Sequence, residues 1–445
     1  MRQRIPCRII LVCSLLVGSL PFADAAPPDP EFTAAKLVFM KEFRKKQPAA
    51  RVAAVNTLAA VAQPDTAELL LKRGIGDDDQ SVRLATRAGL KQLADDRGVR
   101  NYLMDEMKKA FRKTLPNDTN IEVFRALIMT SDDEQQTEIL KSLEDYLMSA
   151  RGNSLMPITV IDDLAMQGDE EALRVVKVLA KSKAFDVNFG YRRCVIQAMC
   201  QIRQPGAIDF LIEALPKTQG LIQHDVVEYL TRVTKQKFKD NDRDWAKWWK
   251  ENQAEFEFPP VAAAAPRVRV TTDDTPTYYG IPICAKRIVF VLDTSGSMRG
   301  PPIDAAKLAL LKAVDSLPEA VFFDVIMFDA QAQTWLPRLV PASKEAKMQA
   351  SQIIVERGLK MGTASNEALN AAFELEPEAI YFLSDGEPTD GLPAQIVSSI
   401  SKLNKTRRVS IHTIGVVTQR NGGIGLTMFM QPLANQNWGT FQLVE

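Results

Sequence analysis

The sequence has few of the residues that build disulfide scaffolds and zinc sites. It contains five cysteines and two histidines among 445 residues. The histidines, His224 and His412, lie far apart, and no Cys or His pair has the spacing of a zinc site. Beyond residue 25 the cysteines are Cys194, Cys200 and Cys284, which show no regular pattern. The fold is therefore expected to depend on a hydrophobic core rather than on disulfides.

An excess of charge of either sign is also missing. Lys plus Arg and Asp plus Glu both number 55. Without a basic excess, the chain has no electrostatic preference for nucleic acid or for an anionic membrane surface. The sequence also lacks a Gly-rich phosphate loop with Lys and Ser/Thr, an HExxH motif, and a Ser-His-Asp set in motif context. These absences favour a protein that is not an enzyme and that has no nucleic-acid partner.

No apolar run is long enough to span a bilayer. Residues 9–20 form a mostly apolar run of about a dozen residues, shorter than a transmembrane helix requires. Three arginines precede or border this run, and "ADA" at 23–25 fits cleavage by signal peptidase after Ala25. We therefore predict a signal peptide over 1–25, no transmembrane segment after its removal, and a secreted or periplasmic location. An uncleaved anchor is the alternative.

Residues 31–253 show the apolar spacing of one helix after another. "RVAAVNTL" (51–58) recurs as "RLATRAGL" (83–90) and more loosely as "RRCVIQAM" (192–199), and a second helical stretch follows the first and third copies. Because one helix pair cannot bury its apolar face alone, stacked copies predict an all-α solenoid. This region resembles HEAT or armadillo-like repeats, which implies a scaffold or partner-binding surface. An irregular helical bundle is the alternative.

Three tryptophans mark the end of the helical region. Trp245, Trp248 and Trp249 have the i, i+3, i+4 spacing of one helix face, so we expect them to close the apolar end of the last repeat. An exposed recognition patch is the alternative. The acidic residues of "DNDRD" (240–244) are expected to form the N-terminal cap and first turn of this helix. A calcium loop is disfavoured because its sixth position, which requires Gly, holds Trp245.

The chain is predicted to be multidomain, because the pattern changes after residue 253. Residues 254–286 contain several prolines and an Ala run, which predict an extended linker. From residue 287 to 445, apolar strand-like runs alternate with helical stretches. This alternation predicts a doubly wound α/β domain with a mainly parallel sheet covered on both faces. Ligands of such sheets bind beyond the carboxyl ends of the strands.

Oxygen-bearing side chains gather at those strand ends. The strand "RIVFVL" (287–292) runs into "DTSGS", the strand "AIYFLS" (379–384) runs into "DG", and "MGTASN" (361–366) lies between them. Two carboxylates and three hydroxyls suit a hard divalent cation, Mg²⁺ or Mn²⁺ rather than Zn²⁺. Gly296 is expected to let the first loop turn. The candidate metal ligands are Asp293, Ser295, Ser297, Thr363 and Asp385.

The motifs "DTSGSM" (293–298), "GT" (362–363) and "SDG" (384–386) resemble the von Willebrand factor type A domain and its metal-ion-dependent adhesion site. The resemblance implies that the five side chains hold the ion, directly or through water, and that an Asp or Glu of a protein partner completes the coordination. The sequence departs from the family at Met361, where a Gly often precedes the Gly-Thr pair. It also shows no terminal helix after the last strand, so the sliding-helix switch of integrin-type members is not predicted here.

The sequence therefore predicts an exported, metal-dependent binding protein, in which the helical repeats add a second interaction surface for adhesion or scaffolding. A magnesium-dependent hydrolase of the phosphatase kind is one alternative, although it would need an acidic general base or nucleophile beside the ion. A regulator subunit of an ATPase complex, resembling the magnesium-chelatase type, is another, and the export signal disfavours it. His412 is interpreted as a structural residue of a strand.

Overall fold

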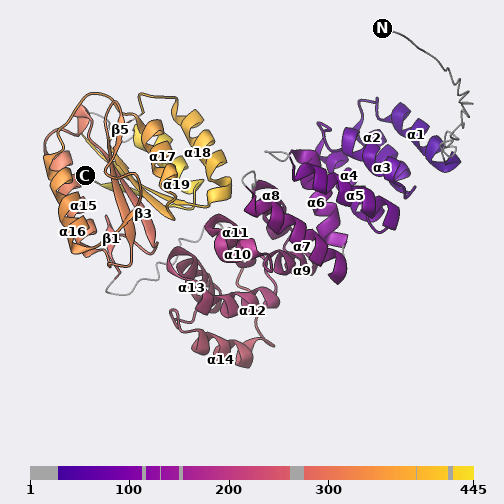
Figure 1. Ribbon diagram of the computed structural model, residues 1–445, viewed down its shortest axis with the longest axis horizontal. Coiled ribbons are helices and arrows are strands. Elements are labelled where there is room, and N and C mark those ends of the chain that lie inside the picture. The colour runs from indigo at the N-terminus through magenta and orange to yellow at the C-terminus, as the bar shows by residue number, and fades with distance from the viewer. Residues whose placement is uncertain are drawn as a thin grey trace, which may run out of the picture.

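The computed structural model describes residues 29–112, 117–130, 132–149, 154–260, 275–386, 388–418 and 424–444. It contains a helical region and an α/β domain, which lie side by side (Figure 1). The predicted signal peptide and residues 261–274 of the predicted linker lie outside the described residues. Within the described part of the chain, every helix falls short of the length and apolarity needed to cross a membrane.

The helical region confirms the all-α prediction, with fourteen α-helices among the described residues. They are α1 (Pro30–Glu42), α2 (Pro48–Ala59), α3 (Pro64–Arg73), α4 (Gln80–Leu93), α5 (Arg97–Ala110), α6 (Asp118–Thr130), α7 (Asp133–Met148), α8 (Leu155–Gln167), α9 (Glu170–Leu179), α10 (Lys183–Val187), α11 (Phe189–Gln201), α12 (Pro205–Ala214), α13 (Gly220–Thr234) and α14 (Asp242–Asn252). The three recurring segments lie in α2, α4 and α11, and the helices that follow the first and third are α3 and α12. Their apolar faces join one core cluster that runs from Phe32 to Trp249.

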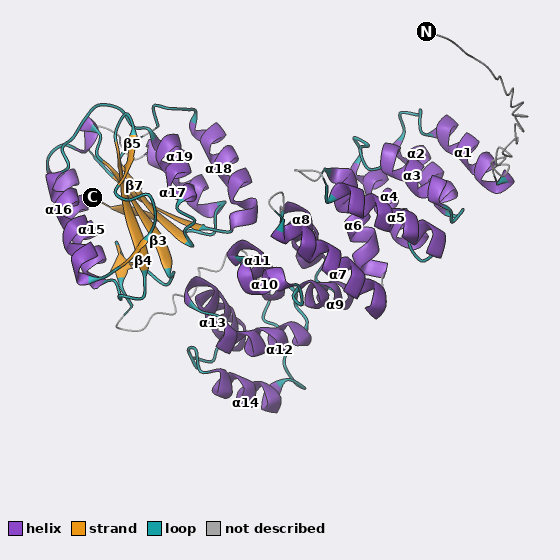
Figure 2. Ribbon diagram, viewed as in Figure 1, coloured by secondary structure: helices purple, strands orange, loops and turns teal. Residues whose placement is uncertain are grey.

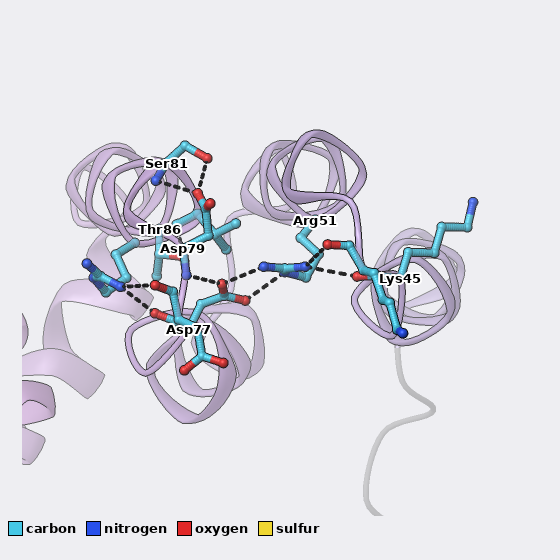
Figure 3. A network of polar contacts seen from close by, with 10 residues as sticks. Lys45, Arg51, Asp77, Asp79, Ser81 and Thr86 are labelled. Carbon is cyan, nitrogen blue, oxygen red and sulfur yellow. Dashed lines mark hydrogen bonds and ion pairs between the residues drawn. The ribbon is translucent and has the colours of Figure 1, made fainter.

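Polar contacts of arginine connect neighbouring helices of this region. In Figure 3, the Arg51 guanidinium donates to both carboxylate oxygens of Asp77, at 2.8 and 2.9 Å, and to the carbonyls of Lys45 and Lys46, both at 2.9 Å. Similar ion pairs recur further along the chain. They are Arg87–Glu122, Arg125–Asp163 and Arg193–Asp225. Each pair joins segments about one helix pair apart in sequence, which places a polar contact between successive layers of the array.

The tryptophans of α14 cover the end of the helical core. Trp245 and Trp249 are 0% and 4% exposed, and both indole N–H groups are paired. The Trp249 indole donates to Asp209 of α12 at 2.6 Å. This burial agrees with a closing role for the helix and not with an exposed patch. The cap of α14 is Asn241, whose side chain accepts the backbone N–H of Asp244, so Asp242 and Asp244 lie in the first turn and Asp240 precedes the cap.

The α/β domain confirms the predicted mainly parallel sheet (Figure 2). The strand order is β5-β4-β3-β7-β8-β9, with β5 and β6 antiparallel to β4 and the other neighbours parallel. Helices α15 and α16 cover one face, and α17, α18 and α19 cover the other. The bounds are β1 (Thr277–Tyr278), β2 (Ile281–Pro282), β3 (Arg287–Asp293), α15 (Pro301–Ser316), β4 (Phe322–Phe328), β5 (Ala332–Thr334), β6 (Val340–Pro341), α16 (Lys344–Glu356), α17 (Ser365–Glu374), β7 (Ala379–Ser384), α18 (Pro393–Arg407), β8 (Ser410–Val416), α19 (Ile424–Asn435) and β9 (Phe441–Val444).

The helical region docks on the edge of the sheet where the parallel strands begin. A Cβ on Gly190 of α11 would lie 2.0 Å from the Thr406 carbonyl oxygen. Only glycine therefore allows α11 to pack this closely against α18. Arg193, 1% exposed, donates to the carbonyl of Arg408 and to the hydroxyl of Ser410. Arg408 in turn donates to both carboxylate oxygens of Asp162 in α8, at 2.7 and 2.6 Å. We call these contacts of Arg193 and Arg408 the arginine clasp.

Candidate metal site

The sheet places two of the predicted acidic ligands next to each other. Strand β3 ends at Asp293, and β7 ends at Ser384, one residue before Asp385. These strands are parallel neighbours, with Leu292 opposite Leu383 in the register. Their carboxyl ends therefore meet at one edge of the sheet, opposite to the edge that carries the arginine clasp.

Hydrogen bonds connect four of the five predicted residues. The backbone N–H of Ser295 donates to Asp293 Oδ1 at 2.8 Å. The hydroxyls of Ser295 and Ser297 lie 2.9 Å apart, and the Ser297 hydroxyl donates to Asp385 Oδ1 at 2.8 Å. The Asp-x-Ser-x-Ser loop thus directs three oxygen-bearing groups towards the end of β7.

Thr363, the fifth predicted residue, lies in a loop beside this network. Its backbone N–H donates to the Thr389 hydroxyl at 2.9 Å, and its carbonyl accepts the Thr389 N–H at 2.9 Å. The loop also pairs with the first one, because the Lys360 N–H donates to the Thr294 carbonyl at 3.1 Å. Among the described residues, no hydrogen bond joins the Thr363 hydroxyl to the other four predicted ligands. The backbone therefore positions Thr363, and its side chain is not engaged by the network.

The glycine that this site requires is Gly362 and not Gly296. Gly362 has φ +94°, and a Cβ there would lie 2.8 Å from the Cα of Ala330. Gly296 has no positive φ and begins a short 3-10 turn over Gly296–Met298. The expectation that Gly296 provides the backbone freedom was wrong, because Gly296 itself adopts a conformation open to any residue.

Three further residues support the site and were missed by the sequence analysis. The Ser384 hydroxyl donates to Asp293 Oδ2 at 2.5 Å and so fixes the second oxygen of that carboxylate. Arg357 donates to the Asp329 carboxylate and, at 3.2 Å, to the Thr294 hydroxyl. Asp329 directly follows the last residue of β4, much as Asp293 ends β3, which was an available signal. Nothing in the sequence pattern marked Arg357.

The electrostatics of the site fit a divalent cation. Asp293 and Asp385 are 0% and 1% exposed. Burial raises the pKa of Asp293 to about 6, hydrogen bonds from Ser384 and Ser295 lower it, and the charge of Asp385 raises it further. A cation would compensate two carboxylates held close together among hydroxyls. Within the described residues no three His, Cys, Asp or Glu side chains converge. The two carboxylates would therefore need the three hydroxyls as the remaining protein ligands of a cation.

If a divalent cation such as Mg²⁺ binds at this site, its affinity is expected to fall as the pH is lowered through about 6. The pKa of Asp293 is raised to about 6, so below this pH a proton competes with the cation for the carboxylate. The dissociation constant should stay constant near pH 8 and rise by up to about tenfold per pH unit below pH 6. Isothermal titration calorimetry at several pH values measures this, and an affinity that stays flat down to pH 5 would contradict it.

Comparisons with known proteins agree with the geometry of this domain. Residues 286–443 match the family described as von Willebrand factor type A domain. Human inter-alpha-trypsin inhibitor heavy chain H1 is 34% identical over 177 residues, which cover 36% of this chain and 18% of the relative. Bovine inter-alpha-trypsin inhibitor heavy chain H4 is 39% identical over 119 residues, covering 24% of this chain and 13% of the relative. The chain thus spans less than a fifth of these relatives' length.

Among solved structures, the chain is similar to a von Willebrand factor type A protein from Catenulispora acidiphila, with 21% identity, a TM-score of 0.31, and coverage of 37% of this chain and 40% of that one. It is also similar to an aerotolerance-related membrane protein from Bacteroides fragilis, with 21% identity, a TM-score of 0.28, and coverage of 36% and 90%. The family match and the strand order of the sheet lead to one conclusion. Residues 286–443 form a von Willebrand factor type A domain, and an all-helical region precedes it.

Proposed function

We propose that this protein binds a partner protein through a divalent cation, Mg²⁺ or Mn²⁺, held at the carboxyl ends of β3 and β7. The proposal rests above all on the hydrogen-bonded network of Asp293, Ser295, Ser297 and Asp385. Hard cations of this kind prefer oxygen ligands, which this edge supplies. The proposed ligands are Asp293, Ser295, Ser297, Thr363 and Asp385.

The composition of the site favours capture of a carboxylate. Two carboxylates nearly balance a divalent charge, and neutral hydroxyls donate little further electron density. When bound, the cation supplies a coordination position that an Asp or Glu of the partner fills. The five side chains would hold the cation, and the Ser384 hydroxyl keeps the Asp293 carboxylate in place.

The proposal extends to the location and to the helical region. The basic and apolar residues before "ADA" (23–25) support export with cleavage after Ala25, to the periplasm or the exterior. The paired helices and their recurring arginine contacts support a HEAT-like array. This array would offer a second interaction surface, so that the protein acts in adhesion or as a scaffold.

Replacing Asp293 by alanine is expected to abolish magnesium binding. The variant loses a carboxylate whose two oxygens are both oriented by the site, and even groups that only support a metal ligand are worth about 10–100-fold in affinity. Calorimetric titration should show at least about a 100-fold loss. Asp304→Ala is the matched control, since this exposed acidic residue of α15 lies outside the site. Equal affinity in both variants would refute the site.

A hydrolase makes a different prediction for the same pair of variants. If the domain binds and does not hydrolyse, phosphate release from p-nitrophenyl phosphate with Mg²⁺ should be equal in wild type and Asp293→Ala. Turnover that disappears in Asp293→Ala and persists in Asp304→Ala would replace the binding function by a hydrolytic one.

A further inference from the structure

A cavity of about 540 Å³ lies between the helical region and the von Willebrand factor type A domain. Helix α13 forms one wall, and β2, β7, β8 and the turn that precedes β9 form the others. The cavity lies at the edge where the strands begin, and none of its lining residues belongs to the candidate metal site. Its volume falls within the range of small-molecule sites, which often form between domains.

Both histidines of the chain line this cavity, although they are far apart in sequence. His224 comes from α13 and His412 from β8. The His412 ring stacks on Tyr381, with centroids 4.8 Å apart, and its Nδ1 accepts the Thr440 backbone N–H at 3.2 Å. A neutral His412 ring therefore carries its hydrogen on Nε2.

The charges of the lining favour a cation over an anion. Asp225 and Glu228 bring two carboxylates from α13, whereas Arg193 brings one guanidinium. Each nitrogen of that guanidinium already donates within the protein, to Asp225, to Ser410 and to the Arg408 carbonyl. Arg193 therefore balances one carboxylate and offers no ready site to an anion. Glu228 lies 4.0 Å from His224 Nε2 on the same helix, so the lining carries a net negative charge as long as His224 is neutral.

The rest of the lining combines apolar side chains with neutral polar ones. Burial raises the pKa of the Cys284 thiol to about 11, so this group stays protonated at neutral pH. Leu221, Ile281 and Pro282 line one part of the cavity, and Phe441 lines another. Such walls suit an apolar body attached to the charged group.

We propose that this cavity binds a small organic amine. Its ammonium group would sit near Glu228 and Asp225, and its apolar body would pack between β2 and the turn before β9. Because both domains form the walls, the bound amine would contact both at once. The inference does not depend on the proposed metal function.

Calorimetric titration of the full chain with 2-phenylethylamine tests the proposal, with EDTA present so that the metal site cannot contribute. The matched ligand is 2-phenylethanol, which has the same body without the charge. We expect the amine to bind at least about tenfold more tightly than the alcohol, as one charge contact of this kind is worth about that factor. Glu228→Gln should remove this difference. Glu251→Gln, which deletes an exposed acid of α14 outside the cavity, should retain it.

A second variant keeps the test valid if Glu228→Gln fails to fold. Gln431 is an exposed residue of α19 that lines the cavity, so Gln431→Lys adds a cation without disturbing the core. It should weaken amine binding at least about tenfold. Absence of amine binding, equal binding of amine and alcohol, or an amine affinity unchanged in a folded Glu228→Gln or Gln431→Lys variant would each overturn the proposal.

Discussion

Arg193→Ala is expected to cause a large loss of stability and to release the two domains from each other. The guanidinium is 1% exposed and donates to Asp225 in the helical region and to Ser410 and the Arg408 carbonyl in the other domain. Its removal leaves a carboxylate, a hydroxyl and a carbonyl without their donor. Breaking a buried ion pair from one side costs about 3–5 kcal/mol. Urea unfolding followed by circular dichroism measures the free energy, and small-angle scattering measures the separation of the domains.

The neighbouring arginine provides a matched control for this change. Within the part of the chain that the structure describes, Arg192 donates only to the carbonyls of Phe185 and Asp186, both in the helical region. Arg192→Ala should therefore cost about 1 kcal/mol, the usual worth of such contacts, and leave the domains docked. Arg193→Lys should restore part of the stability, because it keeps the charge but loses the planar fork. If the two alanine variants unfold at the same urea concentration and scatter alike, the clasp does not hold the domains.

Asp324→Asn is expected to stabilise the protein at pH 8 and to have little effect near pH 4. Asp324 lies within β4, fully buried, and burial raises its pKa from 3.8 to about 7. Its Oδ1 accepts the Leu336 N–H at 3.3 Å, whereas its Oδ2 has no partner among the described residues. Ionisation therefore places a poorly compensated charge in the core.

The sign of this pH dependence follows from proton linkage. Because the pKa is higher in the folded state, the folded protein holds more protons between pH 4 and pH 7, and its stability falls as the pH rises through this range. The loss amounts to roughly 4 kcal/mol for this group and is complete above pH 7. Asparagine cannot ionise, so the difference in unfolding free energy between Asp324→Asn and wild type should grow with pH. Asp315→Asn, at an exposed position of α15, should show no such trend, and a flat difference for Asp324→Asn would contradict the buried ionisation.

Much of the α/β domain could be predicted from sequence because its signals are local. Apolar runs such as 287–292 and 379–384 have the length and composition of buried parallel strands, and the oxygen-bearing residues follow directly after them. Parallel strands end at the same edge, so the meeting of Asp293 and Asp385 follows from the topology. The role of Gly362 depends on a close approach of Ala330, which no local pattern reveals.

The contacts between the domains could not be predicted, because they join residues distant in sequence. Arg193 looks like any arginine on an amphipathic helix, yet its partners include Ser410 at the start of β8. His412 was interpreted as structural, and its ring does stack on Tyr381, but the same ring lines a cavity with His224. That neighbourhood exists only because α13 packs against the sheet, which periodicity alone cannot indicate.

The position of the arginine clasp has a mechanical consequence. The clasp holds the sheet where β8 begins, whereas β3 and β7 end at the opposite edge. A tensile load between that far edge and the helical array therefore runs parallel to the strands. It loads the hydrogen bonds between β7 and β8 together, in shear, rather than opening them one after another. The domain is thus oriented to resist traction along this axis better than traction across it.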